Sequence, residues 1–306
     1  MIPAGEAGPR WPNLFLVGAA KAGTTSLYRE LARHPAIYMS PMKEPHFFSR
    51  IEPAPSWEAF FPHVSDEDEY LALFKGAGNE DLLGEGSTSY LWDSQAAERI
   101  QHVVPEARIL VMLRDPVDRA YSHYWNDVRE GLEKRSFPDA LAEEQRSGPG
   151  GWGASSLYID CGRYADQVAR YLDRFGPGGV LVSFLEDFVT DRTGTMADIH
   201  SFLGVGPVPA GAPLRRMNSI SLPRNRLGGA LLGSGTVRRL ARATVPRPLR
   251  GRLRGALLEE AAPPPMDPAA GELLREIYRP DVARLAELLG RPPPWEALVA
   301  GGSLPG

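Results

Sequence analysis

Residues Phe15 to Thr25, FLVGAAKAGTT, constrain the fold of this chain more than any other stretch. An apolar run typical of a strand stops at Gly18, and Gly23-Thr24-Thr25 opens a segment that is predicted to be helical. A strand, a glycine turn and a helix N-terminus together hold an anion well, because backbone N–H groups and the helix dipole converge on it. The same pattern also occurs in phosphate loops of unrelated nucleotide-binding proteins and in purely structural turns.

The lysine of this loop stands in an unusual place. The spacing is close to the P-loop of NTPases, G-x4-G-K-[ST], but Thr24 occupies the lysine position and Lys21 comes three residues earlier. An NTPase uses that lysine together with Mg²⁺ to gather the β- and γ-phosphates. An early lysine followed by two hydroxyls suits a smaller anion pair, handled without a metal. A P-loop kinase or NTPase is therefore the enzymatic alternative, and the missing lysine argues against it.

Composition favours one α/β domain without metal sites or disulfides. A chain of 306 residues with 43% apolar content can bury a full core. The single cysteine, Cys161, excludes a disulfide framework and cysteine-rich metal sites, and the six histidines show no metal-binding spacing. With no long apolar run and no secretory signal, the expectation is a cytoplasmic protein that needs no metal.

Arginine is concentrated in one segment. Residues 215–254 contain 11 arginines and no lysine, aspartate or glutamate; because the net charge is −4, the rest of the chain carries −15. Arginine suits bidentate recognition of phosphate, sulfate or carboxylate. This Arg-rich segment is predicted to be an insertion or lid that contacts an anionic acceptor, the donor phosphate or a membrane surface; a solvated amphipathic helix is the alternative. A polyanion-binding module is the non-enzymatic alternative for the whole chain, although we expect no nucleic-acid partner.

Strands and helices alternate along the sequence. The patterns predict strands over 14–17, 108–113 and 180–184, and helices over 24–33, 94–102, 116–130, 162–175, 193–203 and 268–289. The predicted fold is α/β: a three-layer, P-loop-like parallel sheet with helices on both faces. We expect one domain over 13–290, with flexible ends at 1–12 and 291–306. Since ligands bind at the carboxyl ends of parallel strands, Lys21, Arg114 and Glu186 should share that edge.

Local signals refine one of these helices, the end of one strand and one loop. Asp115 and Pro116 are predicted to be the N-cap and first residue of helix 116–130. Glu186 and Asp187 are expected to cap the segment after strand 180–184. The stretch SGPGGWGASS, within the region after residue 136, is predicted to be a loop.

Two segments resemble the sulfotransferases that use 3′-phosphoadenosine 5′-phosphosulfate (PAPS). That family carries lysine just ahead of G-[TS]-[TS], as in Lys21-Ala22-Gly23-Thr24-Thr25, and its 3′-phosphate segment is a strand ending in arginine followed by a helical serine eight residues on, as in Arg114 and Ser122. The resemblance implies that Arg114 and Ser122 bind the 3′-phosphate. It implies that the 5′-phosphosulfate is bound by the loop residues Lys21, Ala22, Gly23, Thr24, Thr25 and Ser26. Alone, an RDP sequence is equally an ordinary helix cap with a surface ion pair.

A third segment, Lys43-Glu44-Pro45-His46-Phe47-Phe48, resembles the heparan sulfate N- and 3-O-sulfotransferases. Their catalytic glutamate stands four residues before the second phenylalanine. The resemblance therefore implies that Glu44 is the general base, that His46 assists it, and that Lys21 stabilises the charge on the leaving phosphate. Without the resemblance, the same pattern describes solvated loop charges and a packed histidine.

The resemblance extends over about residues 13–204 and the final helix. The heparan 3-O branch has a substrate-contacting lysine after the acid of the segment EGSTSY (residues 85–90), and Gly86 stands there in this chain. Tyr158 is implied to border the nucleotide, with a core tyrosine as the alternative, and Arg224 to lie in a loop over the 3′-phosphate. The implied activity is in-line transfer of a sulfuryl group from PAPS to a hydroxyl of a carbohydrate or secondary-metabolite acceptor, without a metal.

Overall fold

The computed structural model describes residues 10–50, 63–148, 151–152, 157–207, 221–223, 258–260 and 263–299. These residues fall into two compact units. Within the described residues, the first unit comprises 10–50, 63–114 and 165–207. The second comprises 115–148, 151–152, 157–164, 221–223, 258–260 and 263–299.

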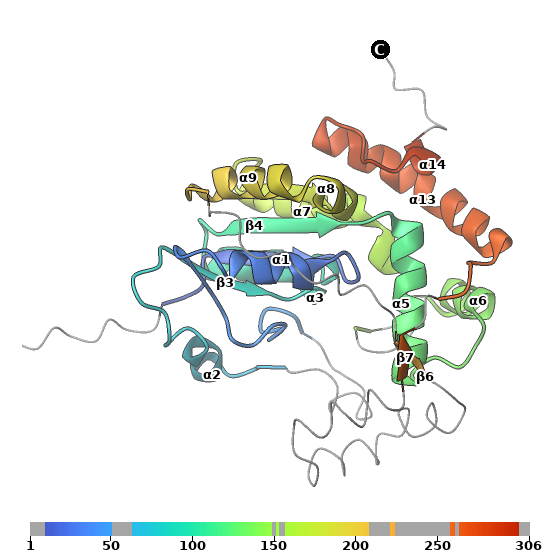
Figure 1. The fold of residues 1–306 in the computed structure, drawn as a ribbon, viewed down its shortest axis with the longest axis horizontal. Helices are drawn as coiled ribbons and strands as arrows, with labels where there is room; N and C mark the ends of the chain where they lie inside the picture. The colour runs from blue at the N-terminus through green and yellow to red at the C-terminus, as the bar shows by residue number, and fades with distance from the viewer. Residues whose placement is uncertain are drawn as a thin grey trace, which may run out of the picture. The chain divides into compact units, whose positions relative to one another are not determined.

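A five-stranded parallel sheet forms the centre of the first unit (Figure 1). β1 is its middle strand and is buried along its whole length, as an uninterrupted apolar run predicts for a strand covered on both faces. β1 pairs with β3 on one side and with β4 on the other. The order across the sheet is β2 (Ile37–Met39), β3 (Leu82–Gly86), β1 (Leu14–Gly18), β4 (Arg108–Leu113) and β5 (Val180–Phe184).

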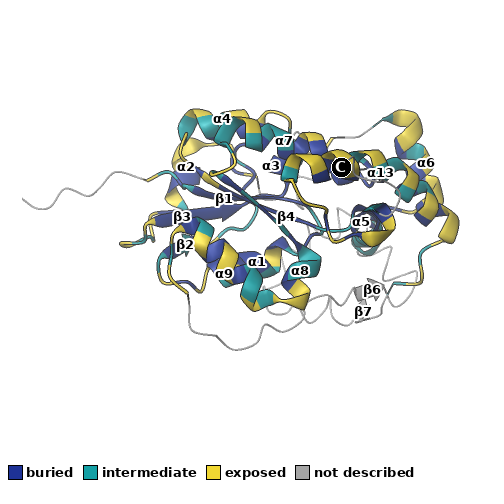
Figure 2. Ribbon diagram, turned by 90° about the horizontal axis from the view of Figure 1, so that it is seen from above, coloured by how far each residue is buried: buried dark blue, intermediate teal, exposed yellow. Residues whose placement is uncertain are grey.

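Helices cover both faces of this sheet (Figure 2). One face carries α1 (Thr24–Leu31), α8 (Leu185–Thr190) and α9 (Arg192–Leu203). The other face carries α3 (Ser89–Trp92), α4 (Ala96–Val103) and α7 (Tyr164–Phe175). The short helix α2 (Glu67–Ala72) also belongs to this unit. The predicted three-layer α/β fold with a parallel sheet is confirmed.

The second unit is mainly helical. It contains α5 (Pro116–Glu130), α6 (Phe137–Ser147), the 3₁₀ turn η1 (Asp160–Gly162), α13 (Pro268–Leu289) and α14 (Glu296–Val299). β6 (Ser221–Pro223) and β7 (Leu258–Glu260) form an antiparallel pair. The α5 N-terminus is as predicted, since the Asp115 side chain accepts from two backbone amides and Pro116 is the first helical residue.

Several elements differ from the sequence expectation. The strands β2 and β3 and the helix α6 were not anticipated. α6 begins beside a proline because Ser136 caps it and Pro138 lies in the first turn, where no helical N–H is needed. The expected caps Glu186 and Asp187 were wrong: both lie in the first turn of α8, after Phe184 at the N-cap, where their charge favours the helix dipole.

The packed part of the chain extends into both predicted flexible ends. Trp11 is half-buried, and its ring lies 5.9–6.1 Å from those of Phe47, Phe48 and Tyr70. Trp295 is buried and leads into α14. Among the described helices, none has the length and apolarity needed to cross a membrane.

Candidate functional site

The loop between β1 and α1 leaves a helix N-terminus without a side-chain cap. Gly23 precedes α1 in a left-handed conformation, with φ of 80°, and a Cβ there would lie 2.5 Å from Leu185 Cδ1, so glycine is required. α1 has no side-chain cap and no acidic residue in its first turn. α2, α5, α6, α9 and α13 each have an aspartate or serine cap, whereas α3, α4 and α8 lack a side-chain cap as α1 does. The N-terminus of α1 is therefore suited to an external anion.

The residues of this loop differ in exposure. Thr24 and Ala22 are buried, Thr25 is exposed, and Lys21, Gly23 and Ser26 are half-buried. Lys21 has a positive φ of 67°, and its carbonyl accepts a hydrogen bond from Arg114 Nη1 at 3.3 Å. Arg114 directly follows β4, the sheet neighbour of β1, and Glu186 follows β5. All three therefore lie past the carboxyl ends of their strands, as expected.

The segment that contains Glu44 also has an unusual backbone. Glu44 and His46 have φ values of 64° and 58°, and in the part of the chain that the structure describes only Lys21 joins them among non-glycine residues with positive φ. Such a conformation costs about 1–3 kcal/mol per residue and persists only where neighbours enforce it. The three residues implied in catalysis thus share a strained backbone, which is a common property of functional sites.

The Glu44 carboxylate lies among cationic and polar groups. Lys43 Nζ forms an ion pair with Oε1, and His46 Nε2 lies 3.6 Å from Oε2. Thr88 Oγ1 lies 3.4 Å from Oε1. Burial alone would raise the pKa of Glu44, but Lys43, His46 and Lys21 together outweigh it and lower this pKa. Glu44 is therefore ionised at neutral pH and able to accept a proton.

His46 is fully buried, and the ring nitrogen that faces away from Glu44 contacts a pair of serines. Its Nδ1 lies 2.7 Å from Ser89 Oγ, which in turn lies 2.7 Å from Ser49 Oγ. Burial lowers the pKa of His46 to about 4, although the Glu44 charge opposes this, so the ring is neutral at pH 7. If Ser89 donates to Nδ1, the one ring proton lies on Nε2, the nitrogen that faces Glu44.

Gly86 has a structural reason for lacking a side chain. Its carbonyl accepts from the Glu44 amide at 2.9 Å, and a Cβ would lie 3.0 Å from Tyr28 Cδ2. Sequence reasoning noticed the segment EGSTSY but missed that Ser87, Thr88 and Ser89 contact the Glu44–His46 loop. The only available signal was a run of hydroxyl residues after an acid. Lys43, which the pattern alone treats as a solvated charge, is likewise an ion-pair partner.

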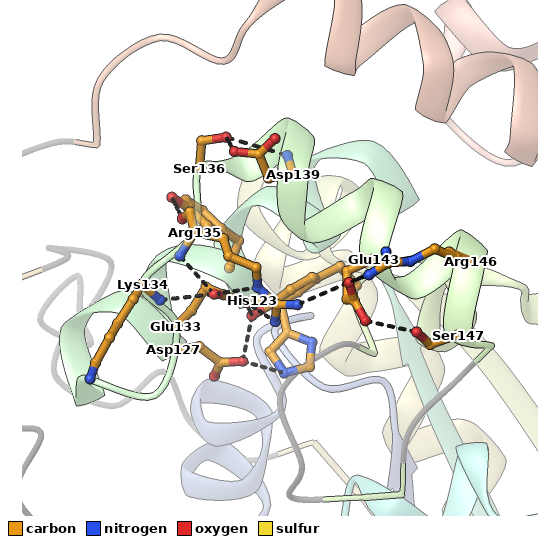
Figure 3. A network of polar contacts seen from close by, with 12 residues as sticks. His123, Asp127, Glu133, Lys134, Arg135, Ser136, Asp139, Glu143, Arg146 and Ser147 are labelled. Atoms are coloured by element: carbon orange, nitrogen blue, oxygen red, sulfur yellow. Dashed lines mark hydrogen bonds and ion pairs between the residues drawn. The ribbon is translucent and has the colours of Figure 1, made fainter.

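Figure 3 shows a network of polar contacts in the second unit that includes Asp127, Glu133 and Arg135. The phenol of Tyr158 contacts two of these residues. Tyr158 is fully buried, and its hydroxyl donates to Asp127 Oδ2 at 3.0 Å and lies 3.3 Å from Glu133 Oε2. Burial would raise the pKa of Glu133, but hydrogen bonds from Arg135 outweigh this and lower it. These contacts are those of a core tyrosine, the alternative that the sequence left open. Ser122 lies half-buried on α5.

Other predicted residues lie outside the described ranges. These are Arg224, with its neighbours Asn218 and Arg226, and the whole Arg-rich segment 215–254 apart from Ser221–Pro223. Among the described residues, no three histidine, cysteine, aspartate or glutamate side chains gather as metal ligands. Cys161 is buried, and burial raises the pKa of its thiol to about 12.

Residues 40–208 match the sequence profile of the sulfotransferase family. This range includes Glu44, His46, Arg114, Ser122 and Tyr158. The chain belongs to the sulfotransferase family. More than half of the chain lies within the match, although the β1–α1 loop precedes it.

Individual relatives agree with this membership. The chain is 30% identical to human bifunctional heparan sulfate N-deacetylase/N-sulfotransferase 3 over 65% of its own length and 23% of the relative's. It is 24% identical to human carbohydrate sulfotransferase 15 over 91% of its length and 53% of the relative's. The chain thus spans about half, or less, of these curated relatives. The crystal structure of a sulfotransferase from Alicyclobacillus acidocaldarius is similar with a TM-score of 0.69 and 34% identity, covering 92% of this chain and 97% of that one.

Proposed function

We propose that this sulfotransferase moves a sulfuryl group from PAPS to a hydroxyl of a carbohydrate or secondary-metabolite acceptor by direct in-line displacement. The observation that carries the proposal is the proximity of an ionised carboxylate to a lysine beside an uncapped helix N-terminus. Lys21 is close enough to Glu44 for its charge to lower the pKa of that carboxyl. Lys21 also stands three residues before α1, whose first turn has no side-chain cap.

The donor is assigned to the strand ends. In this proposal the α1 amides, with Thr24, Thr25 and Ser26, bind the 5′-phosphosulfate, since an uncapped N-terminus stabilises negative charge. The Arg114 guanidinium binds the 3′-phosphate, for which its planar set of donors is suited. Ala22 and Gly23 contribute backbone, and the roles of Ser122, Tyr158 and Arg224 follow from the family resemblance alone.

Each step of the transfer has a group to serve it. The acceptor oxygen attacks sulfur while Glu44 takes its proton, and the bond between sulfur and the phosphate oxygen breaks. Lys21 stabilises the negative charge that develops on the leaving phosphate of adenosine 3′,5′-bisphosphate. His46, through its contact with Glu44 Oε2, keeps the carboxylate oriented. No step in this scheme calls on a metal ion.

The proposed acceptor class rests on the names of the relatives and on one residue that departs from their pattern. The named relatives are carbohydrate and heparan sulfate sulfotransferases, which supports a sugar hydroxyl. Gly86, where the 3-O branch has lysine, argues against a heparan-type acceptor. Family membership disfavours both the kinase and the polyanion-binding alternatives. A cytoplasmic location and membrane contact through the Arg-rich segment remain predictions.

Calorimetric titration tests the donor assignment. We expect adenosine 3′,5′-bisphosphate to bind far more tightly than 5′-AMP or ATP with Mg²⁺. Glu44→Gln should keep this affinity and lower turnover about 10²-fold or more, as removal of a general base does. Turnover is followed as release of adenosine 3′,5′-bisphosphate from PAPS with a panel of 4-nitrophenol, 2-naphthol and neutral disaccharides.

Two outcomes would contradict the proposal. Tight binding of ATP with Mg²⁺ and no preference for a 3′-phosphate would favour a kinase. Full turnover by Glu44→Gln would remove Glu44 from the mechanism while leaving the donor assignment intact.

A further inference from the structure

We propose that Glu85 is a positioning residue, which fixes the backbone of the loop Glu44–Phe48 through the hydroxyls of Ser87 and Tyr90. The inference deepens the proposed function and rests on it, because the loop matters for catalysis only if Glu44 is the base. Glu85 is fully buried and acts only through other residues.

Within the part of the chain that the structure describes, the donors to the buried Glu85 carboxylate are all hydroxyl groups. The Glu85 side chain has no exposed surface. Tyr70 and Tyr90 donate their phenol protons to Oε1 at 3.1 and 2.5 Å, and Ser87 donates to Oε2 at 2.9 Å. Hydrogen bonds to an ionised acceptor are strong, and neighbouring bonds polarise one another. Glu85 therefore fixes the direction in which all three hydroxyls donate.

Two of these hydroxyls connect Glu85 to the catalytic loop. A hydroxyl has one proton to donate, so Ser87 and Tyr90 can meet the loop only as acceptors. Ser87 Oγ accepts from the His46 amide at 3.0 Å, and Tyr90 OH accepts from the Phe48 amide at 3.1 Å. Two backbone amides of the loop are thus tied to one carboxylate, each through a single hydroxyl.

The loop has a backbone that needs such ties. Glu44 and His46 both have positive φ, a conformation that non-glycine residues rarely adopt. Such residues persist where the surroundings enforce them. The Glu44 amide donates to Gly86 O at 2.9 Å, so residues 86, 87 and 90 each receive an amide of the loop. The position of the Glu44 carboxylate is consequently set by the segment around Glu85.

Tyr70 provides a matched control within the same cluster. Its hydroxyl donates to the same Oε1 atom as that of Tyr90. Its ring stacks on Phe47 at 4.1 Å, a contact that phenylalanine keeps. Within the described loop residues, its hydroxyl accepts no backbone amide. Tyr70→Phe therefore removes one donor from Glu85 without cutting either link to the loop.

The arrangement requires Glu85 to accept on both oxygens. A proton on either oxygen would have to be donated, and one of the three hydroxyls would lose its acceptor. Burial and, to a smaller extent, the charge of Glu44 raise the pKa of Glu85 to about 7, although the three hydrogen bonds lower it. The pKa of Glu44 is lowered and that of His46 is about 4. Among the described titratable groups, four tyrosines also interact with Glu85, and their pKa values are raised: Tyr28, Tyr70, Tyr90 and Tyr171. Among these groups, Glu85 is the one that titrates near neutral pH.

Hydrogen exchange measured by mass spectrometry tests the links without any acceptor. In the full chain, we expect Ser87→Ala and Tyr90→Phe to speed exchange of a peptide spanning residues 44–48 about tenfold, as loss of one hydrogen bond does. Tyr70→Phe should leave this peptide unchanged. Equal protection of the loop in all three variants would overturn the proposal. Ser87→Ala and Tyr90→Phe keep the Glu85 carboxylate, so the test does not depend on a variant that loses the buried charge.

Turnover and its pH profile test the consequence. With PAPS and the fastest acceptor of the panel, Ser87→Ala and Tyr90→Phe should lower kcat about tenfold at pH 8 while the affinity for adenosine 3′,5′-bisphosphate stays unchanged. Tyr70→Phe should keep kcat at pH 8. The fall of kcat towards acidic pH should begin at a higher pH in this variant, since the Tyr70 hydrogen bond lowers the pKa of Glu85. A merely structural role of Glu85 would leave this fall of kcat at the same pH.

The two proposals fail in different ways. If Glu44→Gln retains turnover, Glu44 is not the base, whatever the loop does. If Glu44→Gln is inactive but Tyr90→Phe and Ser87→Ala behave like Tyr70→Phe, the base is correct and the positioning role of Glu85 is wrong.

Discussion

Two neighbouring strands of the sheet lead into helices whose N-termini differ in capping. After β1, helix α1 begins at Gly23 with no side-chain cap and no acidic residue in its first turn. After β4, helix α5 begins at Asp115, whose Oδ1 accepts from the amides of Val117 at 2.8 Å and Asp118 at 3.2 Å. Pro116 has no N–H to offer, and Asp118 adds a second negative charge.

Under the proposed function, this contrast divides the recognition of the two phosphates between backbone and side chain. An uncapped N-terminus attracts an external anion, whereas a carboxylate cap occupies the amides and repels one. In the proposal, the backbone after β1 binds the 5′-phosphosulfate. After β4 a side chain takes that role for the 3′-phosphate, and Arg114 stands directly before the cap. The predictions below test this division, beginning with the largest effect.

Lys21→Ala should have the largest effect at the uncapped end. Loss of a charge that acts mainly on the leaving phosphate should lower kcat about 10²–10³-fold, with a much smaller change in bisphosphate affinity. Turnover of PAPS and calorimetry with adenosine 3′,5′-bisphosphate measure the two quantities separately.

Lys75→Ala is the control for this change, because Lys75 is exposed and remains outside the proposed site. Its kinetics should equal those of the natural chain. Equal loss of kcat and of affinity in Lys21→Ala would mean that Lys21 only binds the donor, and the contrast between transfer and binding would disappear.

Arg114→Ala should mainly weaken binding at the second strand end. Removing a guanidinium that serves a phosphate should lower the affinity for adenosine 3′,5′-bisphosphate about 10²-fold. Because Arg114 Nη1 also donates to the Lys21 carbonyl, an indirect effect through the loop is the competing explanation. Titration with 5′-AMP separates the two: a direct contact lowers only the affinity of the 3′,5′-bisphosphate, and an indirect effect lowers both.

Local signals in the sequence were enough for much of the fold. β4, β5, α5 and α13 have the predicted boundaries, because the strands are mainly apolar runs and the helices are amphipathic runs that begin at Asp-Pro and end at Gly. β2 was missed since it has only three residues, and β3 was missed because it contains two glycines and the buried Glu85. A strand that contains a buried charged residue cannot be predicted from apolar patterns alone.

The candidate site was predictable only in its individual residues. Lys21, Glu44 and Arg114 follow from motifs that are contiguous in sequence. The ties from Ser87 and Tyr90 to the loop join residues about forty positions apart, and spacing carries no information on such contacts. The buried hydroxyl contacts of Tyr158 depend on tertiary packing in the same way.

The smallest effects concern the cap itself, and Asp267 offers a matched comparison. Asp115 and Asp267 both precede a proline and both accept two amides through Oδ1. Asp115→Ala and Asp267→Ala should each destabilise the protein by about 1 kcal/mol, as loss of an N-cap does. Denaturant unfolding measures this loss, and unequal losses in the two variants would show that one cap carries a further role.

Asp115→Asn separates the charge of that cap from its hydrogen bonds. Asparagine caps helices about as well as aspartate, so stability should stay nearly unchanged. Removing the negative charge beside Arg114 should raise the affinity for adenosine 3′,5′-bisphosphate about two- to fivefold at low salt, because a carboxylate at the N-terminus opposes an incoming anion. Asp267→Asn should leave that affinity unchanged. A rise in both variants would trace the effect to net charge, whereas a rise confined to Asp115→Asn would place the 3′-phosphate beside the capped end.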